Sequence, residues 1–136
     1  MWRILTCFVV VGLLSNAVAE EKKAPVRELV VKIANAEKGT INEPTVVTNS
    51  DELGKFVTDE AAKKELLKEV DFVKQKLLVF VWAGSGMDAL SFKANDTSTE
   101  VTFTYTRGKT KDLRSHAHVF VLPRDAKFTL LDGRAK

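Results

Sequence analysis

The segment KLLVFVWAG, residues 76–84, constrains the fold more than any other part of the chain. It is an unbroken apolar run, rich in branched and aromatic side chains, and the turn-forming stretch GSGMD overlaps its end. Because successive side chains of a strand point to opposite faces, a run without polar positions needs apolar cover on both sides. We therefore expect residues 76–84 to form a central strand, with Phe80 buried in the core.

Four later segments have the composition of strands, and the turns between them are short. In EVTFTYTR, apolar or aromatic Val101, Phe103 and Tyr105 alternate with threonines, which predicts one buried and one solvated face. A parallel crossover needs a dozen or more residues, so the short turns favour antiparallel pairing. The four expected strands cover residues 89–94, 100–107, 115–123 and 127–133.

The N-terminal half adds two strands and two helices. VRELVVKI (26–33) and TVVTN (45–49) are typical of strands. Ser50 and Thr58 each precede an Asp-Glu pair and an amphipathic segment, which predicts helix N-caps at both positions. The expected fold is α+β: a curved, mainly antiparallel sheet of about six or seven strands, with two short helices after the second strand. A β-sandwich with a helical insertion is the alternative.

The start of the chain has the build of a secretory signal peptide. Arg3 provides a positive charge, residues 4–14 are apolar, and residues 17–19 supply the small side chains of a cleavage site. The apolar run is shorter than the roughly 20 residues that a membrane anchor needs. We expect an exported protein, periplasmic or secreted, with no stable membrane span after cleavage. The expected division is a signal peptide over 1–19, a solvated lead-in over 20–25 and a single globular domain over 26–136.

Cleavage after Ala19 makes Glu20 the first residue of the mature protein. Mass spectrometry of the protein from its native host is expected to find this N-terminus, and an intact segment 1–19 would contradict it. The single cysteine, Cys7, would leave with the leader, so neither disulfides nor thiolate chemistry are expected in the mature chain.

The charge balance excludes some classes of partner. The formal net charge is +3, and it falls to +2 once Arg3 is removed. Nucleic-acid binding would need a concentrated basic face, so no nucleic-acid partner is expected. The tripeptide GKT at 108–110 lacks the upstream glycine of a phosphate-binding loop, since position 103 is Phe. We expect no bound cofactor.

Both histidines of the chain, His116 and His118, lie two residues apart on an expected strand, so they share one face. Such a pair could hold zinc, but a zinc site usually needs three or four protein ligands. A carboxylate such as Asp88 or Asp112 would have to complete it. The simpler interpretation is structural: each ring packs at the edge of the core while a nitrogen reaches a backbone group or water.

No catalytic residue is assigned. Ser85 stands between two glycines, but a nucleophile elbow needs its glycines at positions 83 and 87, which are Ala83 and Met87. The glycines are expected to permit a tight turn with positive φ angles.

Two loops remain as a candidate binding surface, because functional residues gather in loops on rigid scaffolds. The first follows the central strand, and the second is basic. The candidate binding residues are Trp82, Gly84, Ser85, Gly86, Asp88, Arg107, Lys109, Lys111 and Arg114. The basic loop could meet an anionic surface: a lipid headgroup, an acidic glycan or an acidic protein.

Three stretches carry a resemblance to known families: VTNSDELGKF, VDFVKQKLLVFVWAGSGMDAL and RSHAHVFVLPRD. Together they resemble small exported proteins of unknown function in planctomycete-type bacteria, a likeness that implies no activity. More distantly, the chain is similar to a domain of secreted protease-complex accessory subunits. That domain tends to place a Gly-Gly-Tyr type turn after the hydrophobic strand, whereas GSGMD has no tyrosine, so we do not expect a shared binding role.

The leading hypothesis is an exported, non-catalytic binding or accessory module of the bacterial envelope that contacts an envelope or secreted protein or an anionic surface. One alternative is a metal-assisted hydrolase built on His116 and His118. Another is a protease inhibitor that uses the loops at 84–88 and 107–114.

Overall fold

The computed structural model describes residues 24–133. The expected signal peptide and most of the lead-in therefore lie outside the described residues. The strands are β1 (Arg27–Leu29), β2 (Thr45–Val47), β3 (Gln75–Gly84), β4 (Ala89–Ala94), β5 (Glu100–Thr106), β6 (Arg114–Pro123) and β7 (Lys127–Asp132). The helices are the 3-10 turn η1 (Ala36–Lys38), α1 (Ser50–Leu53) and α2 (Glu60–Glu69).

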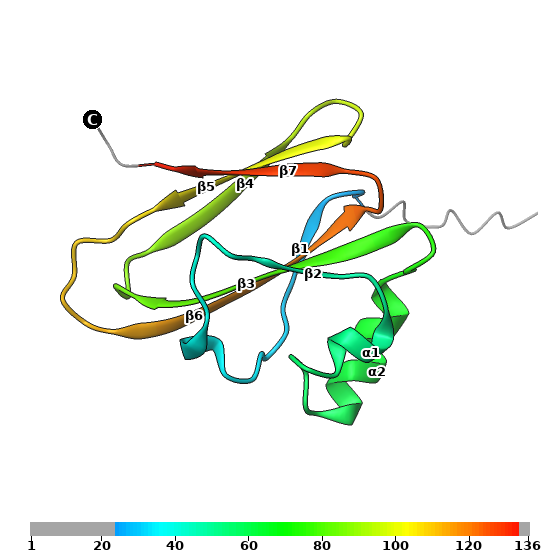
Figure 1. The fold of residues 1–136 in the computed structure, drawn as a ribbon, viewed down its shortest axis with the longest axis horizontal. Coiled ribbons are helices and arrows are strands. Elements are labelled where there is room, and N and C mark those ends of the chain that lie inside the picture. The colour runs from blue at the N-terminus through cyan, green and yellow to red at the C-terminus, as the bar shows by residue number, and fades with distance from the viewer. Residues whose placement is uncertain (1–23, 134–136) are drawn as a thin grey trace, which may run out of the picture.

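The α+β class is confirmed, but the strands form two sheets instead of the single curved sheet that we expected. One sheet has the order β1-β6-β3-β2 and the other has the order β4-β5-β7. All pairs are antiparallel except β5 with β7, which are parallel. The split arises because β3 pairs with β6 over ten residues, whereas β4, which follows β3 directly, pairs with β5. The two helices follow β2 and lie on the far side of the first sheet (Figure 1).

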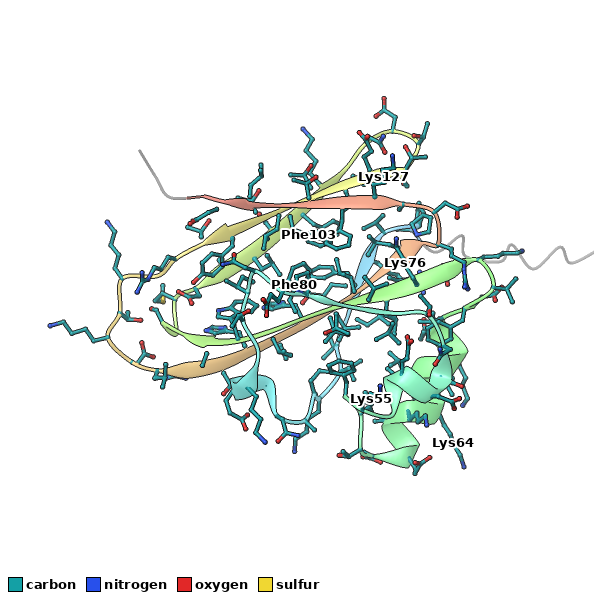
Figure 2. The ribbon with its side chains drawn as sticks, in the orientation of Figure 1. Lys55, Lys64, Lys76, Phe80, Phe103 and Lys127 are labelled. Carbon is teal, nitrogen blue, oxygen red and sulfur yellow. The ribbon has the colours of Figure 1, made fainter. Side chains whose placement is uncertain are left out.

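The central strand β3 is covered on both faces, as expected. Leu78, Phe80 and Trp82 face the second sheet, where they meet Phe103 in one core cluster. The alternate residues of β3 face α1 and α2 in a second cluster. Phe80 is fully buried, and its ring centroid lies 4.9 Å from that of Phe103 between the two sheets (Figure 2). The apolar run thus supports two cores at once.

The alternation of β5 is also confirmed. Val101 and Phe103 are buried, and Tyr105 packs partly buried against the same cluster. The intervening Thr102 and Thr104 are only partly covered. Within residues 24–133, no helix is both long and apolar enough to cross a membrane.

Three expectations about the N-terminal half were wrong in detail. The first strand covers Arg27–Leu29, shorter than 26–33, although Val31 and Ile33 still pack against the helix-side core. The N-cap of α1 is Asn49, not Ser50, because the Asn49 side chain accepts a hydrogen bond of 2.8 Å from the Glu52 N–H.

The second helix is likewise capped one residue from the expected position. The carboxylate of Asp59, not the hydroxyl of Thr58, accepts a 2.9 Å hydrogen bond from the Ala61 N–H. An acidic side chain at this place satisfies a free N–H and also complements the helix dipole, so aspartate has the advantage over threonine.

Candidate functional site

The chain crosses from one sheet to the other twice at the same end of the molecule. The first crossing joins β3 to β4 and the second joins β5 to β6. We call residues 84–88 and 107–114 together the loop end. Figure 1 shows it on the left, away from α1 and α2. The topology therefore brings together the two loops that the sequence marked as candidate binding segments.

Side-chain hydrogen bonds join the two loops into one unit. The hydroxyl oxygens of Ser85 and Thr110 lie 2.5 Å apart. The Gly86 N–H donates to the Asp112 carboxylate at 3.1 Å, and the Arg114 Nε donates to the same carboxylate at 2.8 Å. The loops thus support each other although 25 residues separate the two hydroxyls in sequence.

Asp88 fastens this unit to the core. Its carboxylate accepts hydrogen bonds from the Gly108 N–H at 2.7 Å, the Tyr105 hydroxyl at 2.9 Å and the Trp82 indole N–H at 3.1 Å. Burial alone would raise the pKa of Asp88, but these three donors and the nearby His116 outweigh it, and the pKa lies below its usual value. Asp88 is therefore held as an anion that joins β3, β5 and the second loop.

The hydrogen bond between Asp88 and Tyr105 also changes the pKa of Tyr105. Burial, and then the hydrogen bond to Asp88, raises the pKa of Tyr105. The hydroxyl therefore stays protonated and remains a donor to the carboxylate at neutral pH.

Asp112 is the second anchoring carboxylate. The hydrogen bond from Thr110, followed by those from Arg114 and Gly86, lowers the pKa of Asp112 to about 2. The Asp112 side chain lies on the surface, where these donors surround its negative charge. Both carboxylates of the loop end are thus occupied by donors from the protein itself.

The glycines of the loop end serve close packing instead of a left-handed turn. The expectation of positive φ angles was wrong, because no glycine within residues 24–133 has one. A Cβ atom at Gly84 would collide with the Asp88 carboxylate, and one at Gly108 would meet the Met87 backbone and the Ser85 hydroxyl. A side chain at Gly108 would therefore push the second loop away from the first.

The two histidines stack on Trp82. The ring of His116 lies 4.8 Å from the indole at an angle of 12°, and that of His118 lies 5.4 Å away at 16°. The Nε2 of His116 is 2.8 Å from the carbonyl oxygen of Ser85, and since a carbonyl only accepts, Nε2 is the donor. The Nδ1 of His118 lies 2.6 Å from a Glu28 oxygen.

No group of three His, Cys, Asp or Glu side chains within the described part of the chain is placed to hold a metal ion. The metal-assisted hydrolase needs such a group, because two histidines alone leave a zinc site incomplete. Asp88 and Asp112 are the carboxylates that could have completed it, and both face donors elsewhere in the loop end.

The metal hypothesis has a direct test. We expect the wild-type melting temperature to be the same with and without a chelator, because the histidine contacts are made by protein groups alone. The matched control is the double variant His116→Gln, His118→Gln, which should respond to the chelator no differently. A chelator-induced fall in the wild type that disappears in the double variant would establish a metal site.

An open pocket of about 730 Å³ lies over the loop end. Among the candidate residues, its lining includes Gly84, Ser85, Asp88, Arg107, Lys109 and Lys111. Gly86 and Arg114 line an adjoining hollow together with Met87, and Trp82 is buried beneath. The candidate residues from both loops therefore meet at one end of the molecule.

The sequence interpretation missed part of this pocket. Tyr105 was expected only in the core, although its hydroxyl donates to Asp88, and Thr110 was not singled out, although its hydroxyl lies beside that of Ser85. Ile41 and Asn42, from the segment before β2, supply another part of the lining. A tyrosine at the last inward position of a strand that leads into a candidate loop is a signal that could have found Tyr105.

Comparison with protein-family models, curated proteins and solved structures finds no match for this chain.

Proposed function

We propose that the chain is an exported, non-catalytic module that binds an anionic component of the cell envelope through its loop end. The observation that carries this proposal is the exposed basic group Arg107, Lys109 and Lys111 on a loop that hydrogen bonds hold in place. None of the three has an ion-pair partner among residues 24–133. A fixed loop with unpaired basic side chains is suited to an anionic ligand, because little order has to be gained on binding.

The acidic residues of the loop end support this interpretation. Asp88 receives three hydrogen bonds from within the protein, and Asp112 is paired with Arg114. Their charges are thus already engaged by neighbouring donors. The positive charge of the second loop is the part left for a partner.

The non-catalytic part of the proposal rests on the surroundings of Ser85. Its hydroxyl lies beside Thr110, and the imidazole of His116 is bonded to the Ser85 carbonyl oxygen, not to its hydroxyl. A serine nucleophile needs a base within hydrogen-bond reach of the hydroxyl itself. The arrangement therefore favours a binding role for this loop.

The protease-inhibitor hypothesis uses the same two loops. It is tested by inhibition assays against a panel of cysteine, serine and metalloproteases. Stoichiometric inhibition that disappears when the 107–114 loop is altered would favour the inhibitor over the envelope module.

Co-sedimentation with the cell-envelope fraction of the native host tests the proposed function. The triple variant Arg107→Gln, Lys109→Gln, Lys111→Gln is expected to bind at least about tenfold more weakly, since the loss of one charge-assisted hydrogen bond already costs about this much. The matched control is Lys55→Gln, Lys64→Gln, Lys127→Gln, which removes the same charge from other parts of the surface (Figure 2). It should bind like the wild type. Equal losses of binding in the two triple variants would refute the proposal. So would a wild-type protein that does not sediment with the envelope fraction.

A further inference from the structure

We propose that the anionic component is the surface of a lipid bilayer, and that Met87 and Leu113 insert into it between the headgroups. This inference rests on the proposed function and narrows it to one partner. It depends on two exposed apolar side chains beside the basic residues, for which an anionic partner alone gives no role.

Met87 and Leu113 are two of the large apolar side chains that the fold leaves mostly exposed. Met87 is 67% exposed and Leu113 is 79% exposed. Single exposed apolar side chains are ordinary on protein surfaces. These two differ because each comes from one of the two loops of the loop end, and both lie next to its basic residues.

The linings of the two hollows show how the apolar and basic side chains are interleaved. Leu113 lines the large pocket together with Arg107 and Lys109. Met87 lines the adjoining hollow together with Arg114, and Lys111 belongs to both linings. The surface therefore offers cationic and apolar groups side by side, which is the pattern of proteins that bind at the interface of an anionic membrane.

The loops are held in position for such a contact. Gly108 packs closely against the backbone of Met87, and the hydroxyls of Ser85 and Thr110 join the two loops. Because this end lies away from α1 and α2 (Figure 1), the helices do not stand between it and a flat surface. Little loop ordering would be needed on binding.

A bilayer fits these observations better than a soluble anion or an acidic glycan. Either of those would engage the basic side chains, but would leave Met87 and Leu113 in water. An anionic bilayer accepts both kinds of group, since the basic side chains remain at the headgroups while the apolar ones reach the acyl boundary. Attraction between basic residues and the surface should weaken as salt is added, because it is screened over about 10 Å at 0.1 M.

Binding to vesicles tests the inference. The mature protein is mixed with vesicles of phosphatidylcholine alone, or of phosphatidylcholine and phosphatidylglycerol in equal parts, and partitioning is measured by sedimentation. We expect binding to the anionic vesicles only. Each basic residue near such a surface contributes about fivefold, so Arg107→Gln, Lys109→Gln, Lys111→Gln should bind about 100-fold more weakly. The vesicle affinity of the control Lys55→Gln, Lys64→Gln, Lys127→Gln should differ much less from that of the wild type.

A second variant isolates insertion from charge. Met87→Ser, Leu113→Ser keeps every charge, and we expect it to lose about 100-fold in vesicle affinity, since burial of each side chain is worth about tenfold. Unchanged affinity in this variant would overturn insertion. No binding of the wild type to anionic vesicles, with binding to the native envelope retained, would overturn the lipid partner while the proposed function stands. Both variants alter exposed side chains, so their melting temperatures should match the wild type.

Discussion

Replacement of Phe80 by alanine is expected to lower the free energy of unfolding by about 3–5 kcal/mol. Phe80 has no exposed surface and lies on the strand that separates the two cores. Its ring meets Phe103 at 4.9 Å and Phe120 at 5.9 Å, the latter edge to face. Both neighbours belong to strands paired over their whole lengths, so the cavity left by the ring cannot collapse easily.

Urea unfolding measures this loss. Thr129→Ala is the matched control, because Thr129 is exposed on β7 and its replacement should change the free energy by no more than about 0.5 kcal/mol. A loss below about 1 kcal/mol for Phe80→Ala would mean that β3 is not the centre of the fold.

Replacement of Asp88 by alanine is expected to lower the free energy of unfolding by about 2–3 kcal/mol, because it leaves three hydrogen-bond donors without their acceptor. The donors are the Trp82 indole, the Tyr105 hydroxyl and the Gly108 N–H, and they belong to β3, β5 and the second loop. Asp112→Asn is the control, since that carboxylate lies on the surface and contacts only the loops. It should have a much smaller effect.

The contribution of Asp88 to the stability of the fold is also expected to depend on pH. The pKa of Asp88 is lower in the folded protein than its usual value of 3.8, so the carboxylate stabilises the fold above that value. The stabilisation is lost as the pH falls through the lower, folded pKa. Wild-type stability is therefore expected to drop below about pH 4, and Asp88→Ala should lack this part of the decline.

The fluorescence of Trp82 reports directly on its hydrogen bond to Asp88. The chain has two tryptophans, and Trp2 lies in the expected leader, so fluorescence of the mature protein comes from Trp82 alone. The emission should shift on acidification in the wild type and already be shifted at neutral pH in Asp88→Ala. The same emission in both proteins at neutral pH would show that Asp88 does not hold the indole.

Patterns of burial were readable from the sequence because they depend on local alternation. The unbroken apolar run of β3 could be satisfied only with cover on both faces, and the alternation of β5 fixed which residues face the core. The division into two sheets was not readable. It depends on whether β4 pairs with β3 or with β5. A short turn joins β4 to each of these strands, so antiparallel pairing with either one is compatible with the sequence.

The loop end was predicted in part for a similar reason. Glycines and basic residues marked both loops in the sequence, but their meeting depends on the two crossings between sheets. The role of Asp88 was also hidden, because two of its three donors, the Tyr105 hydroxyl and the Gly108 N–H, lie 17 and 20 residues away in the sequence and approach it only in the folded protein. The helix caps were misplaced by a single residue, since Asn49 and Asp59 compete with adjacent hydroxyl residues for the same free N–H groups.

Contact between the loop end and the native envelope is measured most directly with a polarity-sensitive dye at single cysteines. The mature chain is expected to lack cysteine, so Leu113→Cys and Asp96→Cys each give one labelling site. Position 96 is exposed in the turn between β4 and β5, at the other end of that hairpin (Figure 1). On addition of envelope from the native host, we expect a blue shift at position 113 and none at position 96. A shift at position 96 alone, or equal shifts at both positions, would contradict binding through the loop end.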